Sequence, residues 1–378
     1  MTSRERLQAV LAGKIPDCVP VAPDTSNMIP ARLTGKPFWQ IYLYQDPPLW
    51  LAYLDCVKHF GFDSLMDGYF PLTLPEEADP DAPAWEPMIV YETPERLVVQ
   101  HRRREGRRVA WSSRVDVYYV ADPPTGGVPP EKIGLPPVPR RWRPVEGVKQ
   151  WPTGVDLLRL VKQEMGNHGL VGVWCGTSLL TGNPEAVYSY YDDPAPWRRR
   201  AVELLEHFEA RFHRLLRLPE RPDFLCLGAS GTLVFGTVPM FRELCLPIVQ
   251  HITELAAAAG LPTHIHSCGP ERELVRICAE ETQLTVIDPL EPPPMGDCDL
   301  AHLKRRYGHR LTLKGNLHTT EVMLRGTPET VAAASRQAID AAAEGGRFIL
   351  STGDQCGRDT RDENIQAMIA TARDYGRY

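Results

Sequence analysis

The stretch Pro262-Thr263-His264-Ile265-His266-Ser267-Cys268-Gly269-Pro270 predicts a short buried strand that stops at a turn. A helical pattern follows over residues 271–281, and an apolar run over residues 284–287 predicts the next strand. A strand, a crossing helix and a second strand are the repeating unit of a parallel sheet. This part of the chain therefore predicts an α/β fold.

The same alternation extends in both directions along the chain. Further apolar runs predict strands at residues 170–175, 224–228, 311–314 and 348–350. Helical patterns lie at residues 184–191, 194–216, 239–259, 300–307, 328–344 and 361–375. These units supply six strands, and residues 19–22 and 62–66 supply two more. Eight strands followed by helices close a (β/α)8 TIM barrel, which is the fold that we predict.

Residues 88–120 break this regularity, because polar and apolar residues alternate along them. Alternation with a period of two predicts an antiparallel hairpin or meander. A Pro-rich and Gly-rich stretch follows at residues 122–152. We predict a single TIM-barrel domain over residues 1–378, with residues 85–152 inserted over the barrel mouth after the second strand, because neither part of the insertion is long enough for a core of its own.

The composition excludes several classes of protein. The chain has 378 residues and is 43% hydrophobic and 24% charged, as is usual for a globular protein. The net charge is −6 and the basic residues are not massed on one predicted face, so we expect no nucleic-acid partner. The arginine-rich run at residues 102–108 is interpreted as a solvated hairpin tip.

The sequence also bears on the compartment. No apolar stretch approaches the roughly 18 residues that a membrane span requires. No apolar region follows the first residues as it would in a signal peptide, so we expect a cytoplasmic protein without a membrane partner. The nine cysteines are scattered and lie mostly in apolar runs, which favours buried thiols over disulfides.

A candidate metal site lies at the ends of two predicted strands. His266 and Cys268 are two residues apart, so on an extended segment both side chains point the same way. Cys356 lies 88 positions later (356 − 268), at the end of the last predicted strand. Ligands at the carboxyl ends of barrel strands converge on one mouth, and zinc prefers thiolate and imidazole ligands with one position left open. We interpret His264, on the same side as His266, as a core residue or a residue that orients a ligand.

Short segments spread over the chain carry a resemblance to a known family. They lie at residues 4–7, 16–21, 191–194, 241–247, 299–304, 315–316, 326–329, 345–351 and 360–365. Through them the chain resembles the uroporphyrinogen decarboxylase superfamily over nearly its whole length. The resemblance implies a (β/α)8 barrel, in agreement with the strand count.

Two chemistries are known in this superfamily. Its true decarboxylases bind a tetrapyrrole through an arginine-rich motif after the first strand, but residues 21–28 contain no arginine. Their essential aspartate would fall near Asp63 or Asp67. The other branch consists of zinc-dependent methyltransferases, which move a methyl group between a corrinoid protein and a thiol. His266, Cys268 and Cys356 resemble the metal signature of that branch.

The chain departs from this signature at the third ligand. In the methyltransferases that ligand usually follows the glycine directly, and here the position holds Asp354, with Cys356 two residues further on. A carboxylate is also an acceptable zinc ligand, so both alternatives stay open.

The resemblance implies a zinc-dependent methyltransferase that transfers methyl between a corrinoid and a thiol or similar small-molecule acceptor. The chain contains no Asp-x-His-x-x-Gly motif, so the methyl-corrinoid would be supplied by a partner protein. Polar or aromatic residues at or just beyond predicted strand ends are candidates for substrate contact: Asp24, Asp67, Tyr69, Trp174, Glu291 and Asn316.

Two alternatives remain. One is a metal-independent decarboxylase or lyase of the same fold, and the other is a non-catalytic ligand-binding barrel. Homodimers are common among such barrels, so a homodimer is the assembly that we consider.

Overall fold

The structure is a computed structural model, and it describes residues 1–77, 84–106, 108–175, 184–228 and 232–378. These residues form two compact units. The first unit contains Met1–Asp24, Val57–Gly68 and Leu158–Tyr378, and the second contains Thr25–Cys56 and Tyr69–Leu157.

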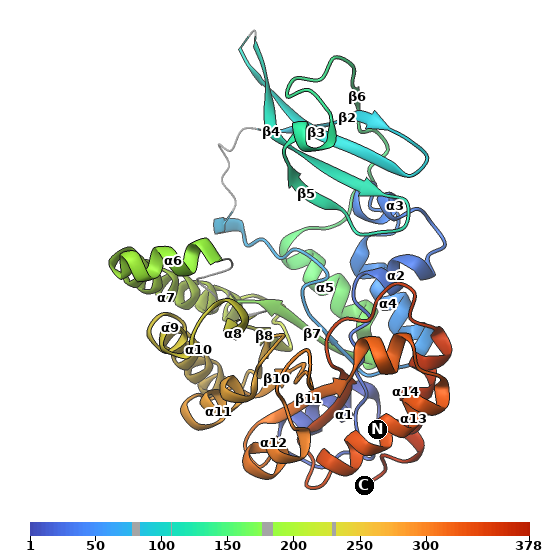
Figure 1. The fold of residues 1–378 in the computed structure, drawn as a ribbon, viewed down its shortest axis with the longest axis vertical. Coiled ribbons are helices and arrows are strands. Elements are labelled where there is room, and N and C mark those ends of the chain that lie inside the picture. The colour runs from blue at the N-terminus through green and yellow to red at the C-terminus, as the bar shows by residue number, and fades with distance from the viewer. Residues whose placement is uncertain (78–83, 107, 176–183, 229–231) are drawn as a thin grey trace. The chain divides into compact units, whose positions relative to one another are not determined.

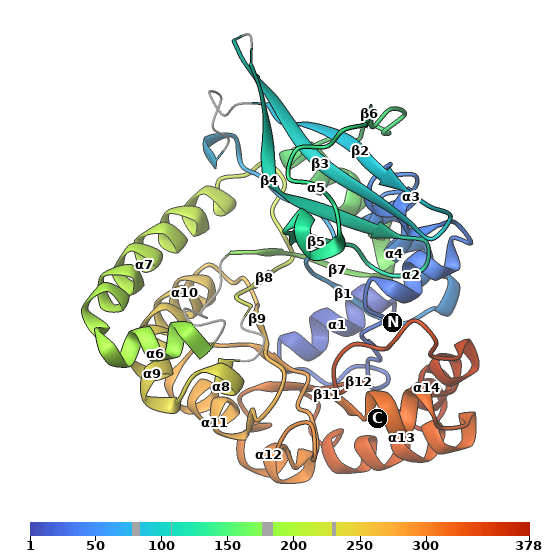
Figure 2. The same cartoon turned by 45° about the horizontal axis from the view of Figure 1, so that its top comes forward.

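A parallel sheet organises the first unit (Figure 1). Its strands are, in their order across the sheet, β1 (Ser64–Met66), β7 (Gly169–Trp174), β8 (Phe224–Cys226), β9 (Thr263–His266), β10 (Val286–Asp288), β11 (Thr312–Leu317) and β12 (Phe348–Thr352). Each pairs in parallel with its neighbours, so all carboxyl ends lie at one edge. The sheet curls into a half-barrel, as in a TIM-like fold (Figure 2).

The predicted strand at residues 19–22 is reduced to an isolated bridge between Val21 and Leu350. Its backbone joins the two edge regions of the sheet, because Val21 O accepts from Asp63 N at 2.8 Å and Leu350 N donates to Pro20 O at 2.9 Å. Proline has no N–H to donate, and Pro20 and Pro23 flank this bridge, which explains its brevity. The closed eight-stranded barrel stays a prediction.

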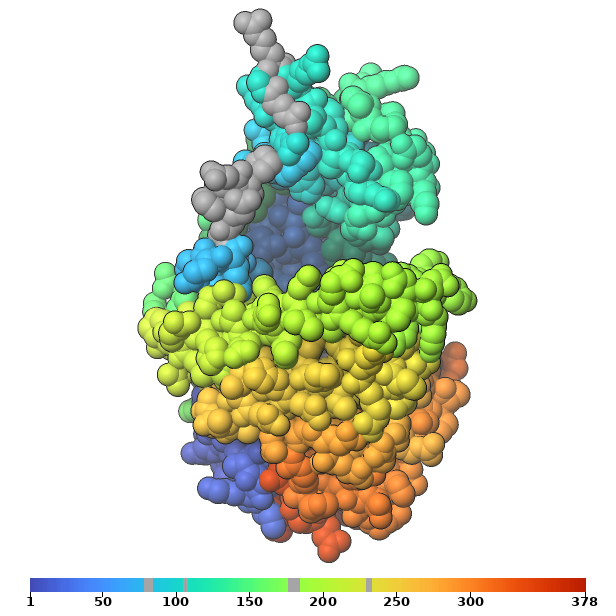
Figure 3. Space-filling view, turned by 90° about the vertical axis from the view of Figure 1, so that its left-hand side faces the viewer, coloured from blue at the N-terminus to red at the C-terminus, as the bar shows by residue number. Residues whose placement is uncertain are grey.

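Helices precede, connect and follow the strands of this sheet along the chain. They are α1 (Ser3–Leu11), α6 (Pro184–Asp192), α7 (Pro194–Leu216), α8 (Thr232–Phe235), α9 (Val238–Leu244), α10 (Leu246–Ala258), α11 (Arg272–Glu281), α12 (Leu300–Tyr307), α13 (Pro328–Ala342) and α14 (Asp362–Asp374). A π-helical turn spans Thr319–Leu324. Figure 3 shows α6 and α7 in green on the surface of this unit, beside the yellow α9 and α10.

Local sequence explains where several helices begin and break. Thr2 and Glu5 form a capping box at the start of α1, which satisfies backbone N–H groups that have no partner within the helix. The helix predicted over residues 239–259 is divided at Cys245 into α9 and α10. Pro247 lies in the first turn of α10, where its missing N–H costs nothing but prevents one continuous helix.

Packing inside the curled sheet is apolar. Leu65, Leu170, Phe224 and Ile349 project from four different strands into one buried cluster with residues of α1. Burial of such side chains stabilises the fold by about 1.5–3 kcal/mol each. The filled interior leaves the carboxyl ends of the strands as the place for a site.

The second unit is built on an antiparallel sheet, as the alternating pattern predicted. Its order is β5 (Thr125–Val128), β4 (Arg108–Tyr119), β3 (Arg96–Glu105), β2 (Glu86–Glu92) and β6 (Arg143–Pro144). The unit also contains α2 (Met28–Leu33) and α3 (Phe38–Tyr42), which the sequence analysis did not assign to the insertion. Two further helices, α4 (Leu49–Phe60) and α5 (Gly154–Met165), contain residues of both units.

Candidate metal centre

The carboxyl ends of the parallel strands carry a cluster of polar side chains. His266 ends β9, Asp288 ends β10, and Asp354 follows β12. Register places Asp288 directly beside His266, because these residues are partners in the β9–β10 ladder. The parallel topology therefore brings together residues that are far apart in the sequence.

Three side chains of this cluster form a potential metal-binding group: His266, Cys268 and Asp354. His266 Nε2 lies 3.8 Å from Cys268 Sγ and 3.6 Å from Asp354 Oδ1. The three donor atoms all lie within 4.8 Å of one another. Ligands about 2.0–2.3 Å from a tetrahedral zinc ion lie about 3.3–3.8 Å apart, so these separations fit such an ion. All three side chains are only half-buried, which leaves access for a fourth ligand.

Asp288 holds the imidazole of His266 in a fixed orientation. Its Oδ1 lies 3.1 Å from His266 Nδ1, which leaves Nε2 directed toward Cys268 and Asp354. Burial alone would lower the pKa of His266, but the Asp288 carboxylate outweighs it and raises that pKa well above the ordinary value. A carboxylate that accepts from one ring nitrogen while the other faces a metal is the common way to orient a histidine ligand.

Lys314 compensates the buried charge of Asp288. Asp288 is 1% exposed and its Oδ2 accepts a hydrogen bond from Lys314 Nζ, which reaches over from β11. Burial raises the pKa of the Asp288 carboxyl, but Lys314 and the two neighbouring histidines lower it well below its usual value overall. The orienting carboxylate is therefore held in its charged form.

Two glutamates fasten the loop that carries Cys268. Gly269 N donates to Glu291 Oε2 at 2.5 Å, and Leu290 N donates to Glu271 Oε2 at 2.7 Å. Glu271, in the loop after β9, thus accepts from the loop after β10, and Glu291, in the loop after β10, accepts from the loop after β9. Each bond satisfies a buried backbone N–H next to the site, which limits the freedom of Cys268.

Cys356 lies apart from this group. Its backbone N donates to Asp24 O at 2.9 Å, and its thiol is fully buried. Burial raises the pKa of the Cys356 thiol to about 12, so the neutral form is favoured. Of the two residues predicted as alternative third ligands, the structure brings Asp354 to His266 and Cys268 and leaves Cys356 outside their group.

A second potential metal-binding group lies beside the first: Asp67, Cys226 and His264. Sequence analysis interpreted His264 as a core or orienting residue. In the structure its ring is buried, with Nδ1 3.0 Å from Asp67 Oδ2 and Nε2 2.8 Å from Asp288 Oδ1. Both histidines of the His-x-His segment therefore contact the same Asp288 oxygen.

The residues predicted to contact substrate are distributed as follows. Asp67 belongs to the second group, and Glu291 accepts from Gly269 beside Cys268. Asn316 Nδ2 donates to Leu290 O at 3.0 Å, which keeps it near the same loop. Trp174 is 41% exposed at the end of β7.

Two other candidates have backbone roles. Asp24 N donates to Thr352 Oγ1 at 3.0 Å, at the carboxyl end of β12. Tyr69 belongs to the second unit, where its hydroxyl donates to Ser26 O at 3.1 Å and its ring stacks on Tyr53.

Sequence reasoning missed Asp288, Lys314 and Cys226. In the structure each ends or lies within a strand. The predicted strands placed Asp288 just beyond one strand, Lys314 at the end of another and Cys226 in the interior of a third. A signal was available, since Lys and Asp are almost never fully buried unless they are paired. Two such residues in neighbouring buried strands indicate an ion pair.

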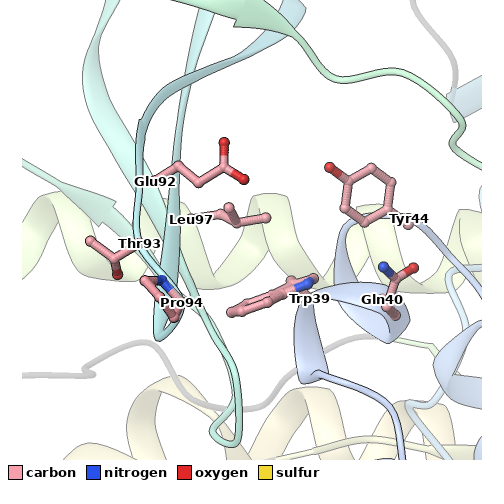
Figure 4. Close-up of a pocket in the computed structure, with 7 residues that line it drawn as sticks. All are labelled: Trp39, Gln40, Tyr44, Glu92, Thr93, Pro94 and Leu97. Atoms are coloured by element: carbon pink, nitrogen blue, oxygen red, sulfur yellow. The ribbon is translucent and has the colours of Figure 1, made fainter.

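The second unit contains a hollow of about 570 Å³ lined by Trp39, Gln40, Tyr44, Glu92, Thr93, Pro94 and Leu97 (Figure 4). In the close-up, Glu92 and Leu97 extend from the sheet, while Trp39 comes from α3 and Tyr44 from the segment just after it. None of the predicted site residues lines this hollow. Among the described residues, no helix has the length and apolarity needed to cross a membrane.

The fold and these groups define a TIM-like α/β protein with candidate metal ligands at the carboxyl ends of its strands. Residues 234–375 match the family model described as uroporphyrinogen decarboxylase (URO-D). This match covers 142 of the 378 residues (375 − 234 + 1) and agrees with the resemblance that the sequence indicated.

Solved structures are similar at low sequence identity. A methyltransferase from Methanosarcina mazei superposes with a TM-score of 0.60 at 15% identity, over 99% of this chain and 99% of that chain. At this identity the likeness concerns the fold alone. A B12-independent methionine synthase from Shewanella sp. W3-18-1, in complex with selenomethionine, gives a TM-score of only 0.34 at 11% identity, over 60% of this chain and 67% of that chain, and carries no argument. No sequence among the curated proteins matches the chain.

Proposed function

We propose that this protein is a zinc-dependent methyltransferase in which His266, Cys268 and Asp354 hold the metal ion. The observation that carries the proposal is the convergence of imidazole, thiol and carboxylate at the strand ends, with the histidine oriented by a buried aspartate. The methyl donor would be a methyl-corrinoid on a separate protein, and the acceptor a small-molecule thiol. The match of residues 234–375 to the URO-D family model and the likeness in fold to a methyltransferase support this choice over other metal chemistry.

A bound zinc ion would lower the pKa of an acceptor thiol and present it as a nucleophile. The protein's own contribution is to fix the ligands. Asp288 sets the direction of His266 Nε2, and Glu291 restrains the backbone next to Cys268. Half-burial of the group leaves an approach for the thiol.

The identity of the third ligand affects the chemistry. With Asp354 the site has one sulfur ligand, whereas Cys356 would give it two. Fewer thiolates leave more positive charge on the metal, so an acceptor thiol would be more acidic but less electron-rich. We assign Asp354 because its carboxylate lies 3.6 Å from His266 Nε2 while the Cys356 thiol is buried elsewhere.

The decarboxylase alternative is less well supported. Asp63, one of the two positions for its essential aspartate, is fully buried and bonds Arg6 and Arg373 at 2.7 and 2.8 Å. That carboxylate is engaged in an ion-pair network on the α1 and α14 side. Asp67 remains at a strand end, but it faces Cys226 and His264.

Metal analysis combined with an activity assay tests the proposal. Purified protein is stripped, loaded with zinc and assayed for demethylation of methylcobalamin by a small thiol. We expect Cys268→Ser to lose one zinc equivalent and the activity, while Cys278→Ser, a buried thiol outside both groups, keeps both. Circular dichroism confirms that each variant folds.

Turnover by fully stripped protein would contradict the proposal and favour the metal-independent lyase. Zinc binding that survives Cys268→Ser undiminished would contradict the ligand assignment. Zinc binding with no transfer from methylcobalamin, free or on a carrier protein, would favour the non-catalytic barrel.

A further inference from the structure

The residues of the second group come from three different strands. Asp67 follows β1, Cys226 ends β8, and His264 lies in β9. The strand order puts β8 beside β9, and Cys226 is the direct register partner of His264. Parallel pairing therefore brings the thiol and the imidazole side by side, independently of the His-x-Cys segment.

The separations within this group are close to those of a metal's ligand shell. Cys226 Sγ lies 3.3 Å from Asp67 Oδ2 and 3.9 Å from His264 Nδ1, and His264 Nδ1 lies 3.0 Å from Asp67 Oδ2. A tetrahedral zinc ion with ligands at about 2.0–2.3 Å requires edges of about 3.3–3.8 Å. Small side-chain adjustments of a few tenths of an ångström would bring all three edges into this range.

Asp288 gives both groups the same support. One of its oxygens, Oδ1, contacts His264 Nε2 at 2.8 Å and His266 Nδ1 at 3.1 Å. In each imidazole the nitrogen that faces Asp288 is the one not needed for a metal. His264 Nδ1 is thereby directed at Asp67 and Cys226, just as His266 Nε2 is directed at Cys268 and Asp354.

The surroundings of the second group favour a cation. Cys226 and His264 are 2% and 3% exposed, so their polar atoms have little contact with water. Asp67 adds a carboxylate to this spot beyond that of Asp288, whose charge Lys314 compensates. A sulfur, a nitrogen and an oxygen donor together suit a borderline divalent ion such as zinc, while calcium and magnesium prefer oxygen ligands.

We propose that Asp67, Cys226 and His264 form a second site for a zinc-type divalent cation, separate from the first and oriented by the same Asp288. The protein would then hold two such ions per chain. The second ion would join the ends of β1, β8 and β9, and its more buried position suits a structural or charge-balancing role. The rival is a metal-free network in which a protonated His264 bridges the two aspartates.

Metal stoichiometry distinguishes the second metal site from the metal-free network. Stripped protein is titrated with cobalt(II), and thiolate-to-cobalt absorption and bound metal are followed together. We expect two equivalents in the native protein, one in Cys226→Ser and one in Cys268→Ser. Cys278→Ser serves as the matched buried control and keeps both.

The outcomes separate this proposal from the proposed function. One equivalent in the native protein, lost in Cys268→Ser and kept in Cys226→Ser, overturns the second site and leaves the first intact. One equivalent in the native protein, lost in Cys226→Ser and kept in Cys268→Ser, supports the second site and overturns the first. If Cys226→Ser does not fold, Asp67→Asn replaces it, because that side chain is 26% exposed. We expect Asp67→Asn to weaken the second equivalent on the order of tenfold or more, and unchanged affinity for both equivalents would overturn the site.

Discussion

At the scale of single residues, Asp288 is the side chain on which both candidate groups depend. It touches two imidazoles through one oxygen and a lysine through the other. None of these partners is next to it in the sequence. The residue that directs the candidate ligands is therefore not itself a ligand.

We predict that Asp288→Asn lowers zinc affinity by about 10- to 100-fold, because an amide orients the imidazoles more weakly than a carboxylate does. Isothermal titration of stripped protein measures this change. Asp374→Asn, an exposed site at the end of α14, is the control and should leave the affinity unchanged. Equal affinities for native protein and Asp288→Asn would contradict the orienting role.

Asp354 adopts a backbone conformation that suits glycine. Its φ is +101°, a region that costs a residue with a side chain about 1–3 kcal/mol. We predict that Asp354→Gly makes the metal-free protein more stable, by about 1 kcal/mol, while it weakens zinc binding. Urea unfolding of stripped protein measures the first effect and metal titration the second. A destabilised metal-free variant that still binds zinc normally would show that Asp354 serves the fold and not the metal.

The sequence indicated some of these residues and could not indicate others. His266, Cys268 and Cys356 were predicted because chemistry-bearing residues cluster where buried strands end, and Asp354 entered as the alternative third ligand through the family resemblance. Asp288 and Lys314 required the register between strands, which places Asp288 beside His266. Register between strands depends on tertiary packing and cannot be predicted from the spacing of residues along one strand.

At the scale of elements, an ion-pair network ties the two ends of the chain to the sheet. Asp63, fully buried just before β1, accepts from Arg6 of α1 and Arg373 of α14. It also accepts from Val21 N at 2.8 Å, which supports the short bridge between the sheet edges. One carboxylate thus connects three segments of the first unit.

We predict that Asp63→Asn lowers the free energy of unfolding by about 1–3 kcal/mol, because buried Arg6 loses one of its two carboxylate partners and keeps only Asp17. Chemical denaturation measures the loss. Glu164→Gln breaks the exposed pair with Lys58 and is the control, with an expected loss of at most about 1 kcal/mol. Similar values for both variants would mean that the buried network contributes no more than a surface pair.

Element types were largely predictable and element limits less so. The helices α7 and α12 occupy the predicted residues, since prolines, caps and glycines mark their ends. The break at Cys245 and the reduction of residues 19–22 to one bridge were not predicted. Both follow from proline positions whose effect depends on whether a backbone N–H is needed in the folded chain.

At the scale of the whole molecule, the chain forms two compact units, and every residue of both candidate groups lies in the first. The antiparallel sheet was predicted from its alternation. That residues 25–56 join the same unit was not, because this association depends on contacts between distant segments. The single domain with an inserted segment stays a prediction.

This division predicts that damage to the second unit spares metal binding. Gln100 is buried there and its Nε2 donates to Ser112 O at 2.7 Å and Pro137 O at 2.8 Å. We expect Gln100→Leu to destabilise the second unit by about 1–3 kcal/mol, since two carbonyls lose their donor. Hydrogen exchange should speed up in β3 and β4 while zinc stoichiometry is unchanged. Loss of zinc in this variant would show that the candidate sites depend on the second unit.

The most direct measurement is X-ray absorption at the zinc edge of the loaded protein. Both candidate groups have one sulfur and two nitrogen or oxygen donors, so we predict an average of one sulfur per zinc at about 2.3 Å, whether one or two ions are bound. Two sulfurs per zinc would mean that Cys356 joins Cys268, and a shell without sulfur would remove the thiol ligands altogether. Either result would contradict the assignment of His266, Cys268 and Asp354.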